Sequence, residues 1–591
     1  MRILLLQPED SPRHGPWTTE SWDLAVDLGR SSPSTAAAWS ELLRCPLLRA
    51  EAFSEGIADI KRAGKILAFG EGRLLDSEGI DWWSLRSIEI LREAAVILSF
   101  QRLVEEIPRA AELWSTRPGT PAVAFARILG LPLRAYGESF VARGMARARH
   151  YARLPRHFSA AQLQEICLDK YDPAYRWRAR FADRVQPASQ PVVLIPSAYT
   201  NVSRVASAYA RLLPDQPFLL VSTRRSATLF DLPPNVQIRP LGAYAETSSP
   251  GPERDEILEK WRKLSAGLRS DSDLKLLQQL GMFDGFPAAF AQGLAVRNAW
   301  RSVLEREPVC AVLCGDDTNV NTRLPVSLAA RRGLPTLDFH HGAMDGYYLV
   351  KQLPCDLYLA KTELERDYLL RVCGIAPDKV VVGAPLPARN VSSSSRNATK
   401  DEPSRRTSLV FFSEPYENIG MRTEEVYREL LPALCRLARE TGRGVVLKLH
   451  PFESASARSE IVRSVLTPAD RKMLTVVSGP LSDDLLSRTW AAITVESTTV
   501  LDCAVRGIPC FLCEWLAFLP FGYLHQYARF GAGQLLRRVE DVAEIPRNLA
   551  LQSVDHEKAV EAQEFRWQGV DPRLLSHCLG VESATAEARP A

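Results

Sequence analysis

Short apolar runs alternate with helical stretches along most of this chain. Residues 191–223 read PVVLIPSAYTNVSRVASAYARLLPDQPFLLVST, an apolar run, a helical stretch and a second apolar run. Strand–helix–strand units of this kind form parallel sheets covered by helices, because a parallel partner needs a crossover connection. The other strands expected before residue 390 are 2–7, 65–71, 309–315, 334–339, 355–361 and 379–385. A long helical stretch is expected from Trp83 to Trp114.

A polar, serine-rich segment without periodicity interrupts this pattern and is predicted to be a linker at 391–408. The alternation then restarts, with strands expected at 408–414, 444–449, 474–479, 491–496 and 508–514. The chain of 591 residues is too long for one hydrophobic core. The predicted organisation is an N-terminal α/β region (1–185), a first Rossmann-like domain (186–390), a second such domain (409–545), a C-terminal helical segment (546–580) and a disordered tail (581–591).

Composition excludes some classes of function. The 73 basic and 70 acidic residues leave a net charge of +3, which gives no global argument for binding nucleic acid. No apolar run reaches the roughly 18 residues of a membrane span. The 11 cysteines have irregular spacing, which favours a reducing, cytoplasmic compartment over a disulfide framework. Cys510 and Cys513 lie in an apolar run and are expected to be buried thiols, with a redox or metal role as the alternative.

Polar side chains follow two expected strands of the first Rossmann-like domain. Asp316 and Asp317 come directly after one strand, and His340 and His341 end another. Ligands bind open α/β sheets at the carboxyl ends of the strands, so these residues are candidates for chemistry. By strand alternation the two imidazoles are expected to point to opposite faces, and one at a cleft could accept a proton from a hydroxyl. The alternative interpretations are a helix cap for Asp317, a metal ligand for the Asp pair and a packed core histidine.

The second Rossmann-like domain offers two candidate phosphate sites. Residues 444–451 read GVVLKLHP, where Lys448 and His450 share one face by alternation, and a cation beside an imidazole suits a phosphate. After the run at 491–496, Ser497, Thr498 and Thr499 open a helix, and the free N–H groups of a helix N-terminus bind phosphate. The alternatives are a solvated lysine with a packed histidine at the first position and an ordinary helix cap at the second.

These patterns resemble a known family. K-x-H-P after one strand, with Ser-[Ser/Thr]-x-x-x-[Asp/Glu] after a later one, resembles the GT-B glycosyltransferases of bacterial surface polysaccharide assembly, and among them the CDP-glycerol glycerophosphotransferases and the capsule sialyl- and Kdo-transferases. The resemblance implies two Rossmann-like domains that face each other across a cleft. It implies phosphate-binding roles for Lys448, His450, Ser497, Thr498 and Thr499. It covers about residues 309–515. Residues 1–185 have no counterpart in these families, and they are candidates for the region that determines acceptor specificity.

The resemblance also implies a reaction. A nucleotide-sugar or CDP-polyol donor, of cytidine or uridine type, would transfer a sugar or a polyol phosphate to the hydroxyl of a glycan or lipid-linked acceptor, without a metal ion or a bound cofactor. His341 matches the base of the glycerophosphotransferases, whereas an acidic residue has this role in the sialyltransferases, so Asp316 and Asp317 compete. Weaker candidates for the cleft are Glu414, Arg422, Glu496 and Asp502.

Two other interpretations of the sequence stay open. The protein could be an inactive, GT-B-shaped binding subunit of a polysaccharide assembly complex, or an enzyme similar to UDP-N-acetylhexosamine 2-epimerases. Membrane contact is a further open point. Arginines 143, 147, 149, 153 and 156 cluster in a segment that, if helical, would present a basic surface either to an anionic leaflet or to solvent.

Overall fold

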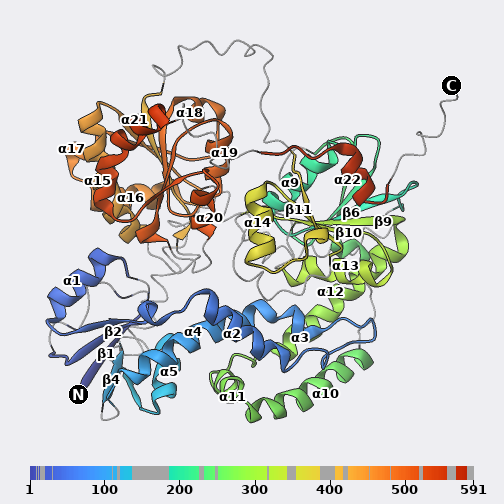
Figure 1. Cartoon of the computed structure of the whole chain (residues 1–591). Helices are drawn as coiled ribbons and strands as arrows, with labels where there is room; N and C mark the ends of the chain where they lie inside the picture. The colour runs from blue at the N-terminus through green and yellow to red at the C-terminus, as the bar shows by residue number, and fades with distance from the viewer. Residues whose placement is uncertain are drawn as a thin grey trace. The chain divides into compact units, whose positions relative to one another are not determined.

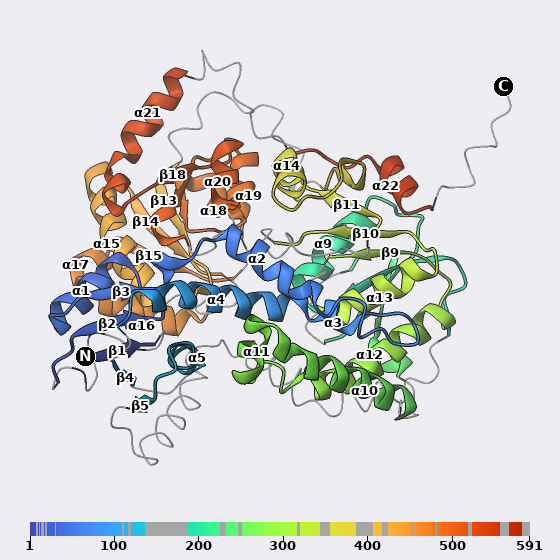
Figure 2. The ribbon, with the colours of Figure 1, turned by 60° about the horizontal axis from the view of Figure 1, so that its bottom comes forward.

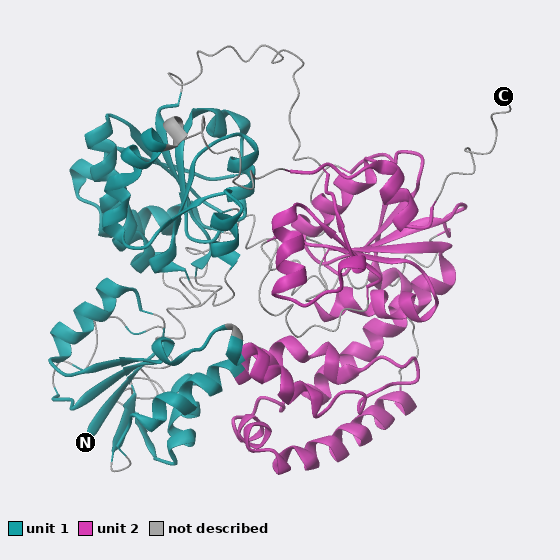
Figure 3. Ribbon diagram, viewed as in Figure 1, with its two compact units in different colours: residues 1–59, 95–163, 388–565 teal, residues 60–94, 164–387, 566–591 magenta. Residues whose placement is uncertain are grey.

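The computed structural model divides the chain into two compact units. Unit 1 comprises residues 1–59, 95–163 and 388–565, and unit 2 comprises residues 60–94, 164–387 and 566–591 (Figure 3). The structure describes residues 1–7, 10, 12, 17, 20–29, 31–108, 111–115, 120–135, 186–224, 232–245, 251–315, 319–342, 355–385, 406–416, 423–450, 453–479, 481–517, 523–555 and 567–581. Each unit is therefore built from separate stretches of the sequence.

Unit 2 contains a seven-stranded sheet of order β12-β11-β10-β9-β6-β7-β8, with every neighbouring pair parallel (Figure 1). Its strands are β6 (Val192–Ser197), β7 (Phe218–Ser222), β8 (Val236–Pro240), β9 (Val309–Cys314), β10 (Thr336–Phe339), β11 (Leu357–Ala360) and β12 (Val380–Val382). All residues of β6 and β7 are buried, as expected of a parallel sheet covered on both faces.

Helices of unit 2 lie between these strands or after them in the chain. They are α9 (Thr200–Ala210), α10 (Gly251–Gly267), α11 (Ser272–Gln279), α12 (Phe286–Arg306), α13 (Val320–Arg331), α14 (Glu363–Arg371) and α22 (Pro572–Cys578). Leu575 and Leu579, at the end of the described chain, are fully buried in the same hydrophobic cluster as β6, β7 and β9 to β11. The predicted C-terminal helical segment therefore contributes α22 to this core.

Unit 1 contains a six-stranded parallel sheet of order β15-β14-β13-β16-β17-β18. Its strands are β13 (Ser408–Phe412), β14 (Gly444–Lys448), β15 (Leu474–Val477), β16 (Thr489–Thr494), β17 (Cys510–Cys513) and β18 (Gln534–Leu536). The helices are α15 (Thr423–Thr441), α16 (Ala455–Val465), α17 (Pro468–Arg471), α18 (Asp483–Arg488), α19 (Thr499–Val505), α20 (Tyr523–Arg529) and α21 (Ile545–Asp555). Figure 1 shows α15 to α17 on one side of the strands and α18 to α20 on the other.

A five-stranded parallel sheet of order β3-β2-β1-β4-β5 also belongs to unit 1. It consists of β1 (Arg2–Leu6), β2 (Leu24–Asp27), β3 (Leu47–Arg49), β4 (Glu112–Ser115) and β5 (Leu133–Ala135), with α1 (Pro33–Leu43) and α5 (Thr120–Leu129). At the start of α1, the N–H groups of Ser32 and Ser34 donate to the carboxylates of Glu425 and Glu429 on α15, across 2.7 and 2.8 Å. Carboxylates are favoured there because a helix N-terminus carries partial positive charge.

The predicted fold class is confirmed: two Rossmann-like parallel sheets are accompanied by an additional N-terminal α/β sheet.

Some predicted elements of the N-terminal region were wrong. The run at 65–71 is not a strand, because Lys65 to Ala68 form the last turn of α2 (Ile57–Ala68), whose apolar residues recur at helical spacing. The stretch from Trp83 to Trp114 is not one helix, since it contains the end of α3 (Trp82–Leu85), α4 (Ser87–Glu105) and the start of β4. Strands β2, β3, β4, β5, β8 and β18 were not predicted.

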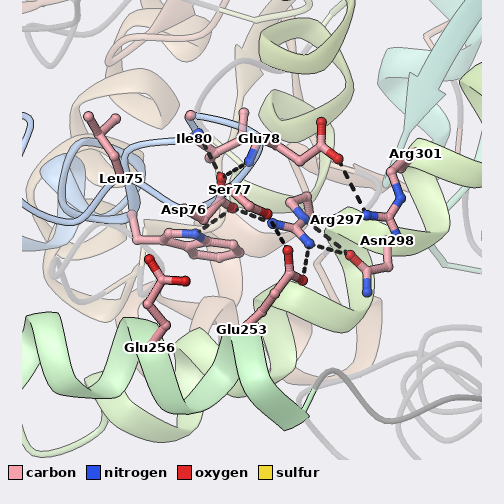
Figure 4. A network of polar contacts seen from close by, with 12 residues as sticks. Leu75, Asp76, Ser77, Glu78, Ile80, Glu253, Glu256, Arg297, Asn298 and Arg301 are labelled. Atoms are coloured by element: carbon pink, nitrogen blue, oxygen red, sulfur yellow. Dashed lines mark hydrogen bonds and ion pairs between the residues drawn. The ribbon is translucent and has the colours of Figure 1, made fainter.

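A buried ionic network joins the segment after α2 to two helices of unit 2. Arg297 on α12 has no exposed surface, and its guanidinium donates to Asp76, 2.7 Å away, and to Glu253 on α10 (Figure 4). Asp76 also accepts hydrogen bonds from the N–H groups of Glu78 and Ile80. Helices α10 and α12 lie side by side in both views (Figure 2). The loop 70–81 is thus attached to the unit that carries the seven-stranded sheet.

Two remaining expectations concern cysteines and membranes. Cys510 and Cys513 are buried, unbridged thiols on β17, as predicted. Within the described part of the chain, every helix is too short or too polar to cross a bilayer. The predicted basic segment 143–156, most of the predicted linker and residues 582–591 of the predicted tail lie outside the described residues.

Candidate functional site

The central strands of the six-stranded sheet end together at one edge. Strands β13, β14 and β15 follow one another to one side, and β16, β17 and β18 to the other, so the strand order reverses between β13 and β16. In open α/β sheets, ligands bind outside the carboxyl ends of the strands at this reversal. The residues that follow β13, β14 and β16 are therefore the candidate site of unit 1, and they include Glu414, His450, Glu496 and Ser497.

Glu453 organises the loop after β14. One of its carboxylate oxygens accepts the N–H of His450 at 2.8 Å, and the other accepts the Ser413 hydroxyl at 2.9 Å and the Arg458 guanidinium at 2.8 Å. The N–H of Glu453 in turn donates to the carbonyl oxygen of His450. Glu453 and Arg458 are both buried, so the pair holds the backbone of His450 in one position beside the end of β13.

Lys448 and His450 differ in their surroundings. The Lys448 ammonium is buried and donates to the carbonyl oxygens of Leu449 (2.7 Å) and Gly479 (2.6 Å). Strand β14 ends at Lys448, so strand alternation does not extend through His450. Burial, with the nearby charge of Lys448, lowers the pKa of His450 to about 4. At neutral pH its imidazole is therefore uncharged, and it can donate or accept a hydrogen bond but cannot act as a cation.

Glu414 and Glu496 are in contact across the strand reversal. A carboxylate oxygen of Glu414 accepts the backbone N–H of Glu496 at 3.1 Å. Burial, with the charges of Glu496 and Glu453, raises the pKa of Glu414 to about 8, although its hydrogen bond with the Glu496 N–H acts in the opposite direction. Glu414 is then mostly protonated at pH 7, and a neutral carboxyl group can donate a hydrogen bond.

The predicted phosphate site after β16 has the expected order of elements. Helix α19 begins at Thr499, and Thr498 precedes it without a side-chain capping bond. The Ser497 hydroxyl accepts the Thr499 N–H at 3.4 Å, which is a long hydrogen bond, and the Ser497 N–H donates to the Thr494 hydroxyl. The capping interpretation is therefore wrong for Thr498 and describes Ser497 only weakly. Asp502 lies on α19 and is 3.7 Å from Arg506.

In unit 2, the two histidines follow β10. This strand ends at Phe339, and the imidazoles of His340 and His341 lie nearly parallel with their centroids 5.6 Å apart. The expectation that they point to opposite faces was wrong, because both residues lie beyond the strand where alternation no longer applies. His341 Nδ1 is 2.7 Å from the carbonyl oxygen of Gly315, at the end of β9.

The hydrogen bond to Gly315 fixes the state of the His341 imidazole. A carbonyl oxygen can only accept, so Nδ1 carries the hydrogen, and Nε2 is the basic nitrogen of the neutral imidazole. Beside it, Nδ1 of His340 is 2.9 Å from the carbonyl oxygen of Gly342. The same oxygen accepts from the ammonium of Lys361, which follows β11 and forms a 2.8 Å ion pair with Glu365.

Some predicted residues cannot be compared with the structure, and some residues of the site were not predicted. Asp316, Asp317 and Arg422 lie outside the described residues. Glu453 and Lys361 were missed, although each follows a strand that was predicted correctly. Position after a strand was the available signal for both residues. One partner of each is distant in the sequence, since Gly342 is 19 residues from Lys361 and Ser413 is 40 residues from Glu453, and spacing does not reveal such pairs.

No protein-family model and no curated protein sequence matches this chain. Solved structures with a similar fold include three kinds of enzyme. A UDP-GlcNAc 2-epimerase from Neisseria meningitidis is 15% identical with a TM-score of 0.40, covering 66% of this chain and 100% of that one. The wall teichoic acid polymerase TagF is 9% identical with a TM-score of 0.38, and the match covers 75% of this chain and 98% of TagF. A glycosyltransferase from Rickettsia africae ESF-5 is 11% identical with a TM-score of 0.37, covering 66% and 94%. At such low identities and TM-scores, function has to be argued from the residues of this chain.

Proposed function

We propose that the protein transfers a sugar or a polyol phosphate from a nucleotide-activated donor to an acceptor hydroxyl in the assembly of a surface polysaccharide. The observation that supports this proposal most is the convergence of Glu414, His450 and Ser497 at the strand reversal of the six-stranded sheet. Three parallel strands end there, and each supplies a polar group to the same edge. This is where doubly wound sheets bind nucleotides.

The groups at this edge suit the leaving phosphate of such a donor. Negative charge accumulates on that phosphate as the bond to the transferred group breaks, and fixed hydrogen-bond donors stabilise it. His450 is held by Glu453 and can donate one hydrogen bond as a neutral imidazole. The hydroxyls of Ser497 and Thr498 can donate two more. A protonated Glu414 repels a phosphate far less than a carboxylate would.

The acceptor needs a base, and His341 is the residue that we assign to this role. Its Nδ1–H donates to Gly315, so Nε2 can accept the proton of an acceptor hydroxyl as the hydroxyl oxygen attacks. Asp316 and Asp317 stay alternative candidates from the sequence. We propose the substrates by chemical class: a donor with a cytidine or uridine base, and an acceptor hydroxyl on a glycan or a lipid-linked molecule.

A thermal-shift panel with CMP, CDP, UDP, GDP and ADP tests the donor site. A ligand that binds only the folded state stabilises it by about 2.7 kcal/mol at a hundredfold excess over its dissociation constant. We expect a selective rise of the melting temperature with cytidine or uridine nucleotides. We also expect His450→Ala to lose this rise and His525→Ala, an exposed histidine on α20, to keep it. The absence of any nucleotide-dependent shift in the wild-type protein would contradict the proposal.

A further inference from the structure

A hollow of about 290 Å³ lies in unit 2, and its described lining residues do not include the strand ends that carry His341. Helix α2 forms one wall with Lys61, Gly64, Lys65, Leu67 and Ala68, and the remaining lining residues are Glu71, Trp83, Ser84, Ser87 and Arg323. The walls thus come from α2, from α3 with the start of α4, and from α13. None of the residues considered above for catalysis or donor binding lines this hollow.

The walls of the hollow are fixed by buried contacts. Trp83 is fully buried, and its indole N–H donates to the Leu67 carbonyl oxygen at 2.8 Å, which holds the end of α2 against α3. Arg323 is buried on α13, and its guanidinium donates to the Ser84 carbonyl oxygen at 3.2 Å. The three walls are therefore joined to one another by side chains.

The charges around the hollow are predominantly positive. Among the described residues that line it are three cations, Lys61, Lys65 and Arg323, and one carboxylate, that of Glu71. Lys61 and Lys65 are one turn apart on α2, so both ammonium groups lie on the same side of the helix. Within the described part of the chain, neither lysine forms an ion pair or a hydrogen bond. An excess of positive charge in a concave site raises the local concentration of anions.

A second hollow of about 540 Å³ adjoins the first at Glu71, Ser84 and Arg323. Apolar side chains contribute to its lining, among them Leu75, Ile80 and Leu85. Two of its polar side chains, Asp81 and Arg331, already have partners. Asp81 accepts from the Trp83 backbone N–H and the Ser84 hydroxyl, and Arg331 donates to the Gly79 carbonyl oxygen. The loop 70–81, which contributes Leu75 and Ile80 to this hollow, is anchored by the ion pair between Asp76 and Arg297 (Figure 4).

We propose that these two hollows form a binding site for a phosphate ester. Its phosphate group lies between Lys61, Lys65 and Arg323, and its organic part extends into the larger, more apolar hollow. A phosphate fits the first hollow because lysine and arginine side chains both donate charge-assisted hydrogen bonds to phosphate oxygens. The combined volume is in the range of pockets that bind small molecules. This site is independent of the proposed transfer reaction.

Binding to phosphate esters tests the site. The double variant Lys61→Gln/Lys65→Gln removes two positive charges from exposed positions and should fold normally. The matched control, Lys263→Gln/Lys275→Gln, removes two charges from α10 and α11, outside both hollows. Titration calorimetry with glycerol 3-phosphate as the soluble probe should show binding to the wild type and the control. The double variant should bind at least about tenfold more weakly, and binding should weaken with added salt.

A second arm distinguishes two sources of the phosphate. Sedimentation with phosphatidylglycerol vesicles, against phosphatidylcholine vesicles, asks whether a lipid headgroup occupies the hollow. Binding to the anionic vesicles alone, lost in the double variant but not in the control, would assign the site to a headgroup. Equal binding of either probe to the wild type and the double variant, or no binding of either probe to the wild type, would overturn the proposal. Nucleotide binding at the six-stranded sheet should be the same in the double variant and the wild type, so the two proposals fail separately.

Discussion

Nδ1 of His341 lies 2.7 Å from the carbonyl oxygen of Gly315, 26 residues earlier in the chain. This bond joins the ends of two adjacent strands, β9 and β10, and determines which imidazole nitrogen can take up a proton. The tautomer of His340 is not fixed in this way, because its Nδ1 lies near both the carbonyl oxygen of Gly342, at 2.9 Å, and the N–H of Gly342, at 3.2 Å. The hydrogen bonds therefore determine a basic nitrogen for His341 and not for His340.

The first prediction concerns this difference. His341→Ala should lower kcat by a factor of about 10² to 10⁴, the usual contribution of a general base, with little change in the KM of the donor. His340→Ala is the matched control and should change kcat by less than about tenfold. Steady-state kinetics with the donor identified by the nucleotide panel measure both. Comparable losses in the two variants would show that the imidazole pair acts as a structural unit and that His341 is not the base.

A second prediction concerns Glu453. Glu453→Gln leaves the buried guanidinium of Arg458 without its carboxylate, and breaking a buried ion pair in this way costs about 3–5 kcal/mol. Hydrogen exchange of the amides at 444–450 and 453–454 should become at least about a hundredfold faster, since 1.4 kcal/mol corresponds to a factor of ten. Asp484→Asn, which breaks the exposed pair with Arg488, is the control and should have an effect below about 1 kcal/mol. Unchanged exchange in Glu453→Gln would contradict the assigned role of Glu453.

A third prediction follows from the raised pKa of Glu414. Because the folded state holds this proton more tightly than the unfolded state, stability falls as the pH rises from about 4.5 through about 8. Glu414→Gln removes the titration and keeps an oxygen that can accept the Glu496 N–H. It should stabilise the protein at pH 7 by up to about 3 kcal/mol, and the gain should vanish near pH 4.5. Thermal unfolding at several pH values measures this, and a gain that does not depend on pH would refute the titration of Glu414.

The fourth prediction has the opposite pH dependence. The pKa of His450 is lowered to about 4 in the folded state from an ordinary value of 6.5, so the unfolded state binds the proton more tightly between these values. Stability that is present above pH 6.5 is therefore lost as the pH falls towards 4, by about 2 kcal/mol at pH 5. His450→Gln should be less sensitive to acid by this amount. Parallel thermal denaturation curves for the wild type and His450→Gln across this range would be evidence against a buried, neutral His450.

Much of the fold could be predicted from the sequence because buried parallel strands are continuous apolar runs. β9, β13 and β14 all end within two residues of a polar group that was expected to follow them. Some short strands were not predicted: β5 and β18 have three residues each, and neither is fully buried. The run at 65–68 was misassigned because a few apolar residues fit a helix as well as a strand, and only the preceding turns of α2 reveal its period.

The candidate site was predictable only in part. Positions after strands made His341, His450 and Ser497 candidates, because the topology of each parallel sheet brings such positions to one edge of that sheet. The properties of these residues were not predictable. The pKa of Glu414 depends on its burial and on Glu496, 82 residues away, and the backbone of His450 is held by Glu453, which also contacts Ser413 just after another strand. Contacts of this kind exist only once the sheet is assembled.

The contribution of α22 to unit 2 has a consequence for synthesis on the ribosome. Residues 567–570 bridge to Thr362 and Ala384, and Leu575 and Leu579 complete a core begun by β6. About 180 residues that belong to unit 1 are made between these two parts of unit 2. The core of the nascent seven-stranded sheet therefore lacks Leu575 and Leu579 while the ribosome translates the whole six-stranded sheet. Translation speed and chaperones at the ribosome exit should matter more for the yield of unit 2 than for the six-stranded sheet.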